Sequence, residues 1–322
     1  MRILSGITPS GTPHIGNYFG MMKPALELQE QGEAFLFIAD YHSLTVNPKP
    51  EDLRKRTIEV ALDFLACGIN PEKTVFFRQS DVPQVTELTW ILAPLVPVGL
   101  LERCHSYKDK VAKGFIPNAA LFSYPILMAA DILLYQSEIV PVGKDQKQHL
   151  EVTRDIAIKF NNSYGDIFTI PTPQIKDSVA VVPGVDGQKM SKSYDNTLEL
   201  SGGKKAIRKK FMKIVTDSKG MEDAKNPDRC NVFALYKLFA NEAQQAELAN
   251  KYRQENIGFG YGHAKQELFE LYWDYFTDFR SKREELEKNL DYVNSILVKG
   301  AEKAQVVAEK TMCEVRKAVG LR

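Results

Sequence analysis

Apolar and polar positions follow two alternating patterns in the first half of the chain. Short β-branched or aromatic runs, typical of strands, are separated by longer stretches whose apolar residues recur at helical spacing. The runs predict strands at Arg2–Ile7, Ala34–Asp40, Thr74–Gln79, Glu138–Val142 and near Val179–Val182. The longer stretches predict helices at Asn17–Gln31, Glu51–Ala66, Pro83–Ala93, Ala119–Tyr135 and Asp145–Phe160. This alternation predicts a doubly wound α/β fold with a parallel sheet.

The strand pattern ends at about residue 195, and only helical periodicity with charged outer faces follows. The helices are predicted at Lys204–Val215, Asn231–Asn241, Ala243–Glu255, Tyr261–Asn289 and Asp291–Val319. A chain of 322 residues is also longer than one small core usually carries. We therefore expect an α/β domain over residues 1–195 and an all-helical domain over residues 196–322, with the last helix packing back toward the first domain.

The composition is that of an ordinary globular protein, with 44% hydrophobic and 26% charged residues, which excludes disordered, collagen-like and small disulfide-rich classes. The net charge of +1 means that a nucleic-acid partner would need a local basic patch. Residues 189–213 provide one, because eight Lys and Arg residues there face only Asp195 and Glu199. A solvated helix face is the alternative interpretation.

The chain shows no pattern typical of secretion, disulfide bonding or membrane insertion. Its four cysteines are widely spaced and form no Cys-x-x-Cys pair, so we expect reduced thiols. The first residues lack the features of a signal peptide, and no apolar run approaches the roughly 18 residues of a membrane span. We expect a cytoplasmic protein without a membrane partner.

A turn rich in proline and glycine connects the first predicted strand to the first helix. It reads Thr8-Pro9-Ser10-Gly11-Thr12-Pro13-His14-Ile15-Gly16-Asn17. The backbone N–H groups of a helix amino terminus at the end of a strand form an anion site. Gly11 and Gly16 would let a ligand approach the backbone, and His14 and Asn17 can donate to phosphate oxygens. Many α/β turns have this composition without a ligand, so the turn alone is weak evidence.

A second motif follows the last predicted strand and reads Gly187-Gln188-Lys189-Met190-Ser191-Lys192-Ser193. Two lysines three residues apart in a loop with small hydroxyl residues can neutralise a triphosphate, and such a loop can close over a nucleotide. An exposed lysine loop is the alternative. The coincidence of this loop with the turn at His14 favours a nucleotide site.

These two motifs resemble the H-I-G-H and K-M-S-K-S signatures of the class I aminoacyl-tRNA synthetases. The second signature is matched in full, and Asn17 replaces the last histidine of the first, as in the tryptophanyl branch. Met128–Tyr135, Val140–His149 and Arg154–Ala157 are also similar to the bacterial members of that branch, and the likeness covers essentially the whole chain. The resemblance implies a Rossmann-type catalytic domain, and a ligase that uses ATP to join tryptophan to tRNA(Trp) through an adenylate, without a covalent enzyme intermediate.

Asp131 falls in an otherwise apolar predicted helix, where an ionised carboxylate is costly unless a donor meets it. The resemblance implies that Asp131 accepts the indole N–H of tryptophan, so that amino acids without this donor are rejected. A helix cap or an internal ion pair is the alternative. The other tryptophan-binding residues that the resemblance implies are Leu4, His42, Tyr124, Met128, Val140, Val142 and Gln146, with Tyr124 and Gln146 on the amino group.

The resemblance also implies an ATP site. Its residues are Thr8, Pro9, Ser10, His14, Gly16, Asn17, Gly143, Lys144, Asp145, Val181, Lys189, Met190, Ser191, Lys192 and Ser193. Lys189, Lys192 and Lys110 would supply positive charge to the reaction, while Mg²⁺ would be held mainly through the ATP phosphates, without a metal site in the protein. Asp145 could instead be a plain helix cap, and Lys110 a surface lysine.

The helical domain is implied to read the tRNA anticodon, and the family forms homodimers. Apolar stretches around Trp90–Leu101 and Ala119–Ser123 could form the dimer interface or be buried within one chain. Leu4 and Thr8 depart from the aromatic residue and the glutamine that are common in the family. The competing interpretations are a tyrosyl member of the family, an adenylyltransferase of the same superfamily, and a catalytically silent RNA-binding paralogue.

Overall fold

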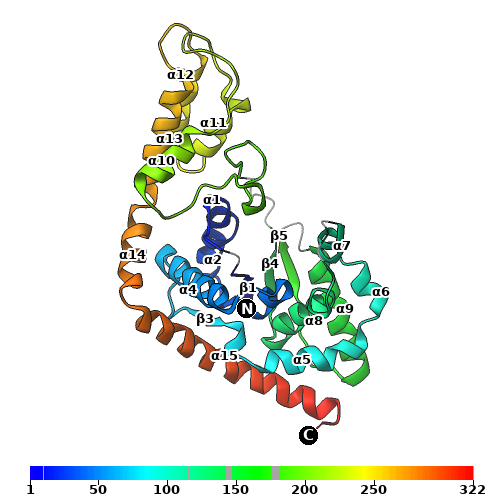
Figure 1. Ribbon diagram of the computed structural model, residues 1–322. Helices are drawn as coiled ribbons and strands as arrows, with labels where there is room; N and C mark the ends of the chain where they lie inside the picture. Colours follow the sequence, from blue (N-terminus) through cyan, green and yellow to red (C-terminus); the bar gives the residue numbers. More distant parts are fainter. Residues whose placement is uncertain (10, 113, 115, 143–146, 176–181, 322) are drawn as a thin grey trace. The chain divides into compact units, whose positions relative to one another are not determined.

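The computed structural model describes residues 1–9, 11–112, 114, 116–142, 147–175 and 182–321. The described strands form a five-stranded parallel sheet (Figure 1). The strand order is β3-β2-β1-β4-β5, and the strands are β1 Arg2–Ile7, β2 Glu33–Ile38, β3 Thr74–Arg78, β4 Ile139–Val142 and β5 Thr172–Ile175. All neighbouring strands pair in parallel. The predicted doubly wound α/β class is confirmed.

The fifth strand differs from the sequence prediction. It lies at Thr172–Ile175, whereas the sequence predicts the last strand near Val179–Val182. Residues 179–181 lie outside the described residues, and Val182 is not part of a strand. In the sequence, Pro173 argues against a strand at this place, because proline cannot donate a backbone hydrogen bond. A proline is tolerated in an edge strand, and β5 is the edge strand next to β4.

The strand order places a topological switch point at the centre of the sheet. The chain leaves β1 toward β2 and β3 on one side and returns to place β4 on the other side. Ligands of open α/β sheets bind at the carboxyl ends of the strands at such a point. Thr8 and Pro9 follow β1 at this edge, while the residues that follow β4, 143–146, are outside the described range.

The chain folds as two compact units, which we call the sheet unit and the helical unit. The sheet unit contains Met1–Gly11, Ala25–Ser178 and Leu286–Arg322, and the helical unit contains Thr12–Pro24 and Val179–Glu285. This division differs from a single boundary at residue 195, because the turn at His14 and the lysine loop, residues 187–193, belong to the helical unit. The last helix belongs to the sheet unit, in line with the prediction that it packs back toward the first domain.

The helices follow the predicted pattern closely, although the predicted helix Tyr261–Asn289 is divided in two at Phe276. In the sheet unit they are α3 Asp40–Ser43, α4 Pro50–Cys67, α5 Gln84–Leu92, α6 Val98–Glu102, α7 His105–Ala112, α8 Ala119–Leu134, α9 Lys147–Tyr164 and α15 Leu290–Ala318. In the helical unit they are α1 Ile15–Asn17, α10 Lys204–Met212, α11 Asn231–Tyr236, α12 Glu242–Arg253 and α13 Tyr261–Tyr275. α2 Lys23–Leu28 and α14 Thr277–Glu287 each cross a boundary between the units. None of the described helices is both long and apolar enough to cross a membrane.

The last helix, α15, packs directly on β3, an edge strand of the sheet (Figure 1). Gly300 makes this approach possible, because a Cβ at this position would lie 1.9 Å from the carbonyl oxygen of Phe76. Beyond Gly300, the α15 residues that join the core of the sheet unit begin with three alanines and end with two larger side chains: Ala301, Ala304, Ala308, Met312 and Val315. A helix placed against an edge strand also prevents that edge from pairing with another chain.

Candidate functional site

The carboxyl ends of β2 and β3 bring two polar side chains to Asp131 of α8. Asp131 is 2% exposed, and its Oδ2 lies 2.8 Å from Nε2 of His42, which follows β2. Its Oδ1 accepts a hydrogen bond of 2.7 Å from Nε2 of Gln79, which follows β3. The structure thus brings together Asp131 and His42, which the sequence analysis predicts as binding residues, and adds Gln79, which it does not predict. The one signal for Gln79 is its place at the end of the predicted strand Thr74–Gln79.

A second, half-buried carboxylate connects the same two strand ends. Asp40 Oδ1 accepts hydrogen bonds from the backbone N–H groups of Ser80, at 3.0 Å, and Tyr41, at 3.1 Å, and its Oδ2 accepts one from the Ser80 hydroxyl. The Tyr41 N–H also donates to Oε1 of Gln79 at 3.1 Å. Asp40 and Gln79 thus hold the ends of β2 and β3 in a fixed relation.

Burial raises the pKa of Asp131 above its ordinary value, and the hydrogen bonds from His42 and Gln79 oppose this shift because they favour the charged form. The nearby Asp40 carboxylate raises it further. Each carboxylate oxygen can accept two hydrogen bonds, and the described protein donors supply one to each. Asp131 therefore keeps the capacity to accept an N–H from a ligand.

The other residues predicted to bind tryptophan lie in different surroundings. Leu4 and Val140 are buried in the core of the sheet unit, and the half-buried Met128 packs against that core. The Tyr124 hydroxyl forms a hydrogen bond with Nε2 of His149. Gln146 and the side chain of Val142 are outside the described residues. The binding roles of these residues remain predictions.

Lys110 lies in the last turn of α7 and is half-buried. Burial lowers the pKa of its ammonium group, and the structure records no ion pair for it with any described residue. Its role toward ATP remains a prediction.

In the helical unit, the turn at His14 is joined to the chain that follows the lysine loop. The Ile15 N–H donates to the Leu198 carbonyl at 2.9 Å, and the Leu200 N–H donates to the Pro13 carbonyl at 3.4 Å. Ile15, Leu198 and Leu200 are buried, so a short antiparallel pairing with an apolar base holds the two segments together. The two signature motifs, about 175 residues apart in the sequence, thus belong to one compact unit.

Gly16 lets the two motifs approach closely. A Cβ at Gly16 would lie 3.0 Å from the imidazole of His14 and 3.5 Å from the Cβ of Met190, which is buried. Asn17 fixes the start of the turn, because its Oδ1 accepts the backbone N–H of His14 at 3.1 Å. Of the other residues predicted to bind ATP, Thr8 and Pro9 belong to the sheet unit. Ser10, Gly143, Lys144, Asp145 and Val181 lie outside the described residues.

The lysine loop is a hairpin that Asn196 braces from within. The Met190 N–H donates to the Val182 carbonyl at 2.9 Å, and Gly187 lies near the tip with a φ of +83°. Asn196 is 1% exposed, accepts the Ser191 N–H at 2.7 Å and donates to the Lys189 carbonyl at 3.1 Å. The brace keeps the loop backbone fixed while the side chains of Lys189 and Lys192 remain exposed; the side chain of Ser193 is not described.

The imidazole of His14 is neutral at physiological pH. Burial lowers its pKa to about 4, the positive charge of Lys192 lowers it as well, and Glu199 opposes the shift. Its Nδ1 is buried and forms no hydrogen bond with a described residue. A neutral imidazole next to the lysine loop can donate one hydrogen bond to an anionic ligand without the cost of a second buried charge.

We expect this histidine to make the protein less stable as the pH falls. The unfolded chain takes up a proton at about pH 6.5 and the folded chain only at about pH 4, so stability is lost between these two values. The upper limit of this loss is about 3 kcal/mol. Urea unfolding at pH 7 and pH 4.5 should show a smaller loss for His14→Gln than for the wild type; equal losses would contradict the assignment.

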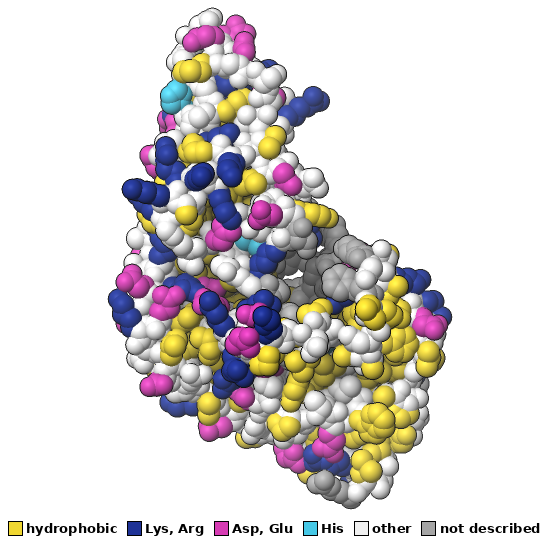
Figure 2. Space-filling view, in the orientation of Figure 1, with side chains coloured by type: hydrophobic (Ala, Val, Ile, Leu, Met, Phe, Trp, Pro, Cys, Tyr) yellow, Lys and Arg dark blue, Asp and Glu magenta, His cyan; other side chains and the backbone are white. Residues whose placement is uncertain are grey.

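Basic side chains gather over α10 in the helical unit (Figure 2). Lys204, Lys205, Arg208 and Lys209 are exposed there. The ring of Trp273 contacts two cations, with Lys204 5.3 Å and Arg280 3.7 Å from the ring centroid. Lys210 is neutralised by an ion pair with Glu199. The basic run of the sequence is therefore an exposed surface of the helical unit.

Comparison with known proteins identifies the family. Residues 1–277 match the model of the class I tRNA synthetases for W and Y. The chain is 55% identical to a tryptophan–tRNA ligase of Fusobacterium nucleatum over 99% of this chain and 98% of that protein. It is 53% identical to one of Rhodopirellula baltica over the full length of both.

The structure is similar to that of a tryptophanyl-tRNA synthetase from Campylobacter jejuni in complex with ADP and tryptophan. The TM-score is 0.95 at 49% sequence identity, and the match covers all of both chains. With both signature motifs joined in the helical unit and relatives that match over the full length, the chain belongs to the class I tRNA synthetases of the tryptophan and tyrosine group.

Proposed function

We propose that this chain is a tryptophan–tRNA ligase that activates L-tryptophan with ATP and then transfers it to the terminal ribose of tRNA(Trp). The observation that carries the proposal is the pairing of Pro13–Ile15 with Leu198–Leu200, which unites the complete K-M-S-K-S loop with the turn at His14. The relatives from Fusobacterium nucleatum and Rhodopirellula baltica, which match over the full length, support tryptophan as the amino acid.

In the first step, the carboxylate of tryptophan attacks the α-phosphorus of ATP and pyrophosphate leaves. A ribose hydroxyl of the tRNA then attacks the carbonyl carbon of the adenylate, and AMP leaves. Neither step needs a nucleophile from the protein, because orientation and charge neutralisation can supply the rate.

The exposed ammonium groups of Lys189 and Lys192 would neutralise the transferring phosphoryl group and the leaving pyrophosphate, and Lys110 would add a third charge. His14 would donate to a phosphate oxygen as a neutral imidazole, with Asn17 holding its turn. Mg²⁺, bound through the phosphates, would add to this neutralisation. Asp131, held by His42 and Gln79, would accept the indole N–H.

The two units would have different roles, because the proposed binding residues are distributed between them. The sheet unit would hold tryptophan, and the helical unit would bind tRNA. The exposed surface of α10 would contact the tRNA backbone, because phosphate contacts provide affinity without reading sequence. The enzyme would act in the cytoplasm, where tRNA is charged.

Two copies of the chain would form the homodimer. Trp90 is 80% exposed and Val98 62% exposed, and both lie in the stretch that the sequence offers as an interface. In the proposed dimer, the partner would cover these apolar side chains, which a single chain leaves in water. Analytical ultracentrifugation that finds only monomers at micromolar concentration would contradict the dimer.

ATP–pyrophosphate exchange with each of the twenty amino acids tests the proposed function, because it needs no tRNA and reports activation directly. Exchange with tryptophan alone supports the proposal. Exchange with tyrosine would keep the reaction but overturn the substrate, and exchange with none would favour the RNA-binding alternative.

A further inference from the structure

Gln79 is a buried side chain whose amide lies between two fixed groups. It begins a short 3-10 turn, Gln79–Asp81, at the end of β3, and it is 2% exposed. Its Nε2 donates to Oδ1 of Asp131 at 2.7 Å, and its Oε1 accepts the Tyr41 N–H at 3.1 Å. Both ends of the amide are therefore used within the protein.

The orientation of this amide follows from its partners. A backbone N–H can only donate, so the oxygen of the Gln79 amide must face Tyr41 and the NH₂ group must face Asp131. The opposite orientation would place the NH₂ group against the Tyr41 N–H and the amide oxygen against Oδ1 of Asp131, and both pairs repel. Gln79 thus presents a donor to Asp131 in one direction only.

The carboxylate of Asp131 is held at both oxygens, by Gln79 at Oδ1 and by His42 at Oδ2. A carboxylate with a donor on each oxygen cannot rotate about its Cβ–Cγ bond without breaking one of these bonds. Its remaining lone pairs therefore point in fixed directions. A fixed acceptor discriminates strongly against a ligand that lacks the matching donor, because the acceptor is then left unpaired.

We propose that Gln79 is a positioning residue that fixes the Asp131 carboxylate for the ring N–H of the amino acid, and so sets the selectivity for a substrate that carries this donor. This inference rests on the proposed function. Gln79 touches no reacting atom; it acts through Asp131.

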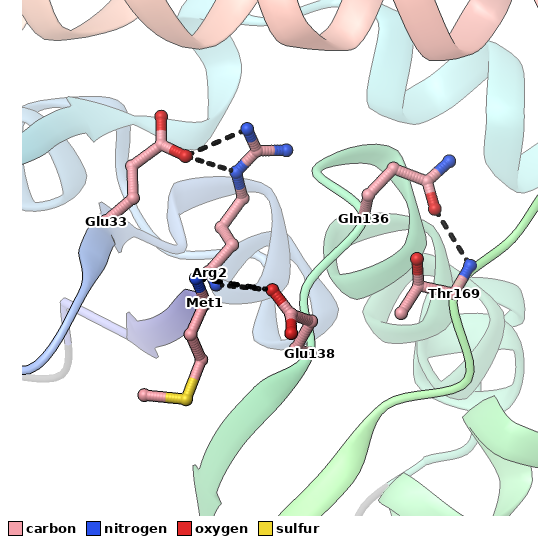
Figure 3. Close-up of a pocket in the computed structure, with 6 residues that line it drawn as sticks. All are labelled: Met1, Arg2, Glu33, Gln136, Glu138 and Thr169. Carbon is pink, nitrogen blue, oxygen red and sulfur yellow. Dashed lines mark hydrogen bonds and ion pairs between the residues drawn. The ribbon is translucent and has the colours of Figure 1, made fainter.

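The variant that tests this role is Gln79→Met, which keeps the length of the side chain but cannot donate to Asp131. The matched control is Gln136→Met. Gln136 also uses both ends of its amide, donating to the Ile167 carbonyl at 3.1 Å and accepting the Thr169 N–H at 2.8 Å. It lines a separate pocket of about 540 Å³ near the amino ends of β1, β2 and β4, with Glu33 and Glu138 (Figure 3).

The readout is the ratio of kcat/KM for tryptophan to that for its benzothiophene analogue, in which sulfur replaces the ring N–H, in pyrophosphate exchange. We expect Gln79→Met to lower kcat/KM for tryptophan by about 10–100-fold and to change that for the analogue much less, so that the ratio falls about tenfold or more. The KM for ATP should stay within about twofold. Gln136→Met should leave the ratio unchanged even if it unfolds at a lower temperature.

A second variant keeps the test decisive if Gln79→Met folds poorly. Gln79→Leu also removes the donor to Asp131 and places no polar group there, so the ratio should fall in the same way. Equal losses for both amino acids in these variants, or the same fall in Gln136→Met, would overturn the role of Gln79 alone. A wild type without tryptophan-dependent exchange would overturn the proposed function and this inference with it.

Discussion

Replacing Lys192 by alanine is expected to slow tryptophan-dependent pyrophosphate exchange by about 10²–10³-fold, with little change in tryptophan affinity. Lys192 is exposed on a loop that Asn196 braces, and its charge reaches the imidazole of His14 in the other signature motif. An ammonium group at this place would act mainly on charge that develops as pyrophosphate leaves, so its removal should lower kcat. Exchange kinetics and tryptophan binding by calorimetry measure the two effects separately.

Lys299→Ala provides the control for this experiment, because Lys299 is an exposed lysine of α15 in the sheet unit. Its removal takes away the same formal charge and should leave the exchange rate unchanged. An unchanged exchange rate in Lys192→Ala would contradict the role of the lysine loop. An equal loss of rate in both variants would show that the effect comes from the net charge of the protein and not from the position of Lys192.

Asp131→Ala is expected to reduce activation of tryptophan by about 10³-fold or more while the KM for ATP stays close to its wild-type value. The substitution removes the proposed acceptor for the indole N–H and leaves His42 and the buried Gln79 without their partner. Each donor left without a partner lowers the free energy of unfolding by about 1–3 kcal/mol. The measurement is the KM for each substrate in pyrophosphate exchange, together with thermal unfolding.

Asp131→Asn separates the two contributions to that loss. The amide keeps the size of the side chain and one acceptor oxygen, so the core should stay packed while tryptophan activation still falls. Equal rises in the KM values for tryptophan and ATP in both variants would show that Asp131 is a structural residue.

The sequence predicts most of the fold because its strands and helices carry strong local patterns. β1 has the predicted limits, Arg2–Ile7, and the limits of β2, β3 and β4 differ from prediction by one or two residues. The short strand β5 carries no such pattern, because Pro173 and Gln174 interrupt it and its pairing with β4 decides its conformation. The membership of α15 in the sheet unit depends on Gly300 and Phe76, whose contact no local pattern encodes.

The candidate site could be predicted only where a motif carries it. The two signature motifs contain His14, Lys189 and Lys192. Asp131 could be recognised because it is a charged residue in an otherwise apolar helix. Gln79 and Asn196 are single amides in polar surroundings, and their roles arise from contacts that the fold creates. Gln79 contacts Asp131, which is 52 positions away in the sequence. From the sequence alone, Asn196 is one of several polar residues after the lysine loop, and its hydrogen bonds could not be predicted.

The packing of α15 on β3 also determines when the sheet unit can be completed during synthesis. β3 leaves the ribosome about 220 residues before the helix that covers its edge. At the usual 5–20 residues per second, the nascent sheet has an open edge for roughly ten to forty-five seconds. Unpaired edges of this kind promote aggregation, so this edge is at risk of pairing with another chain until Gly300 emerges and α15 packs on β3.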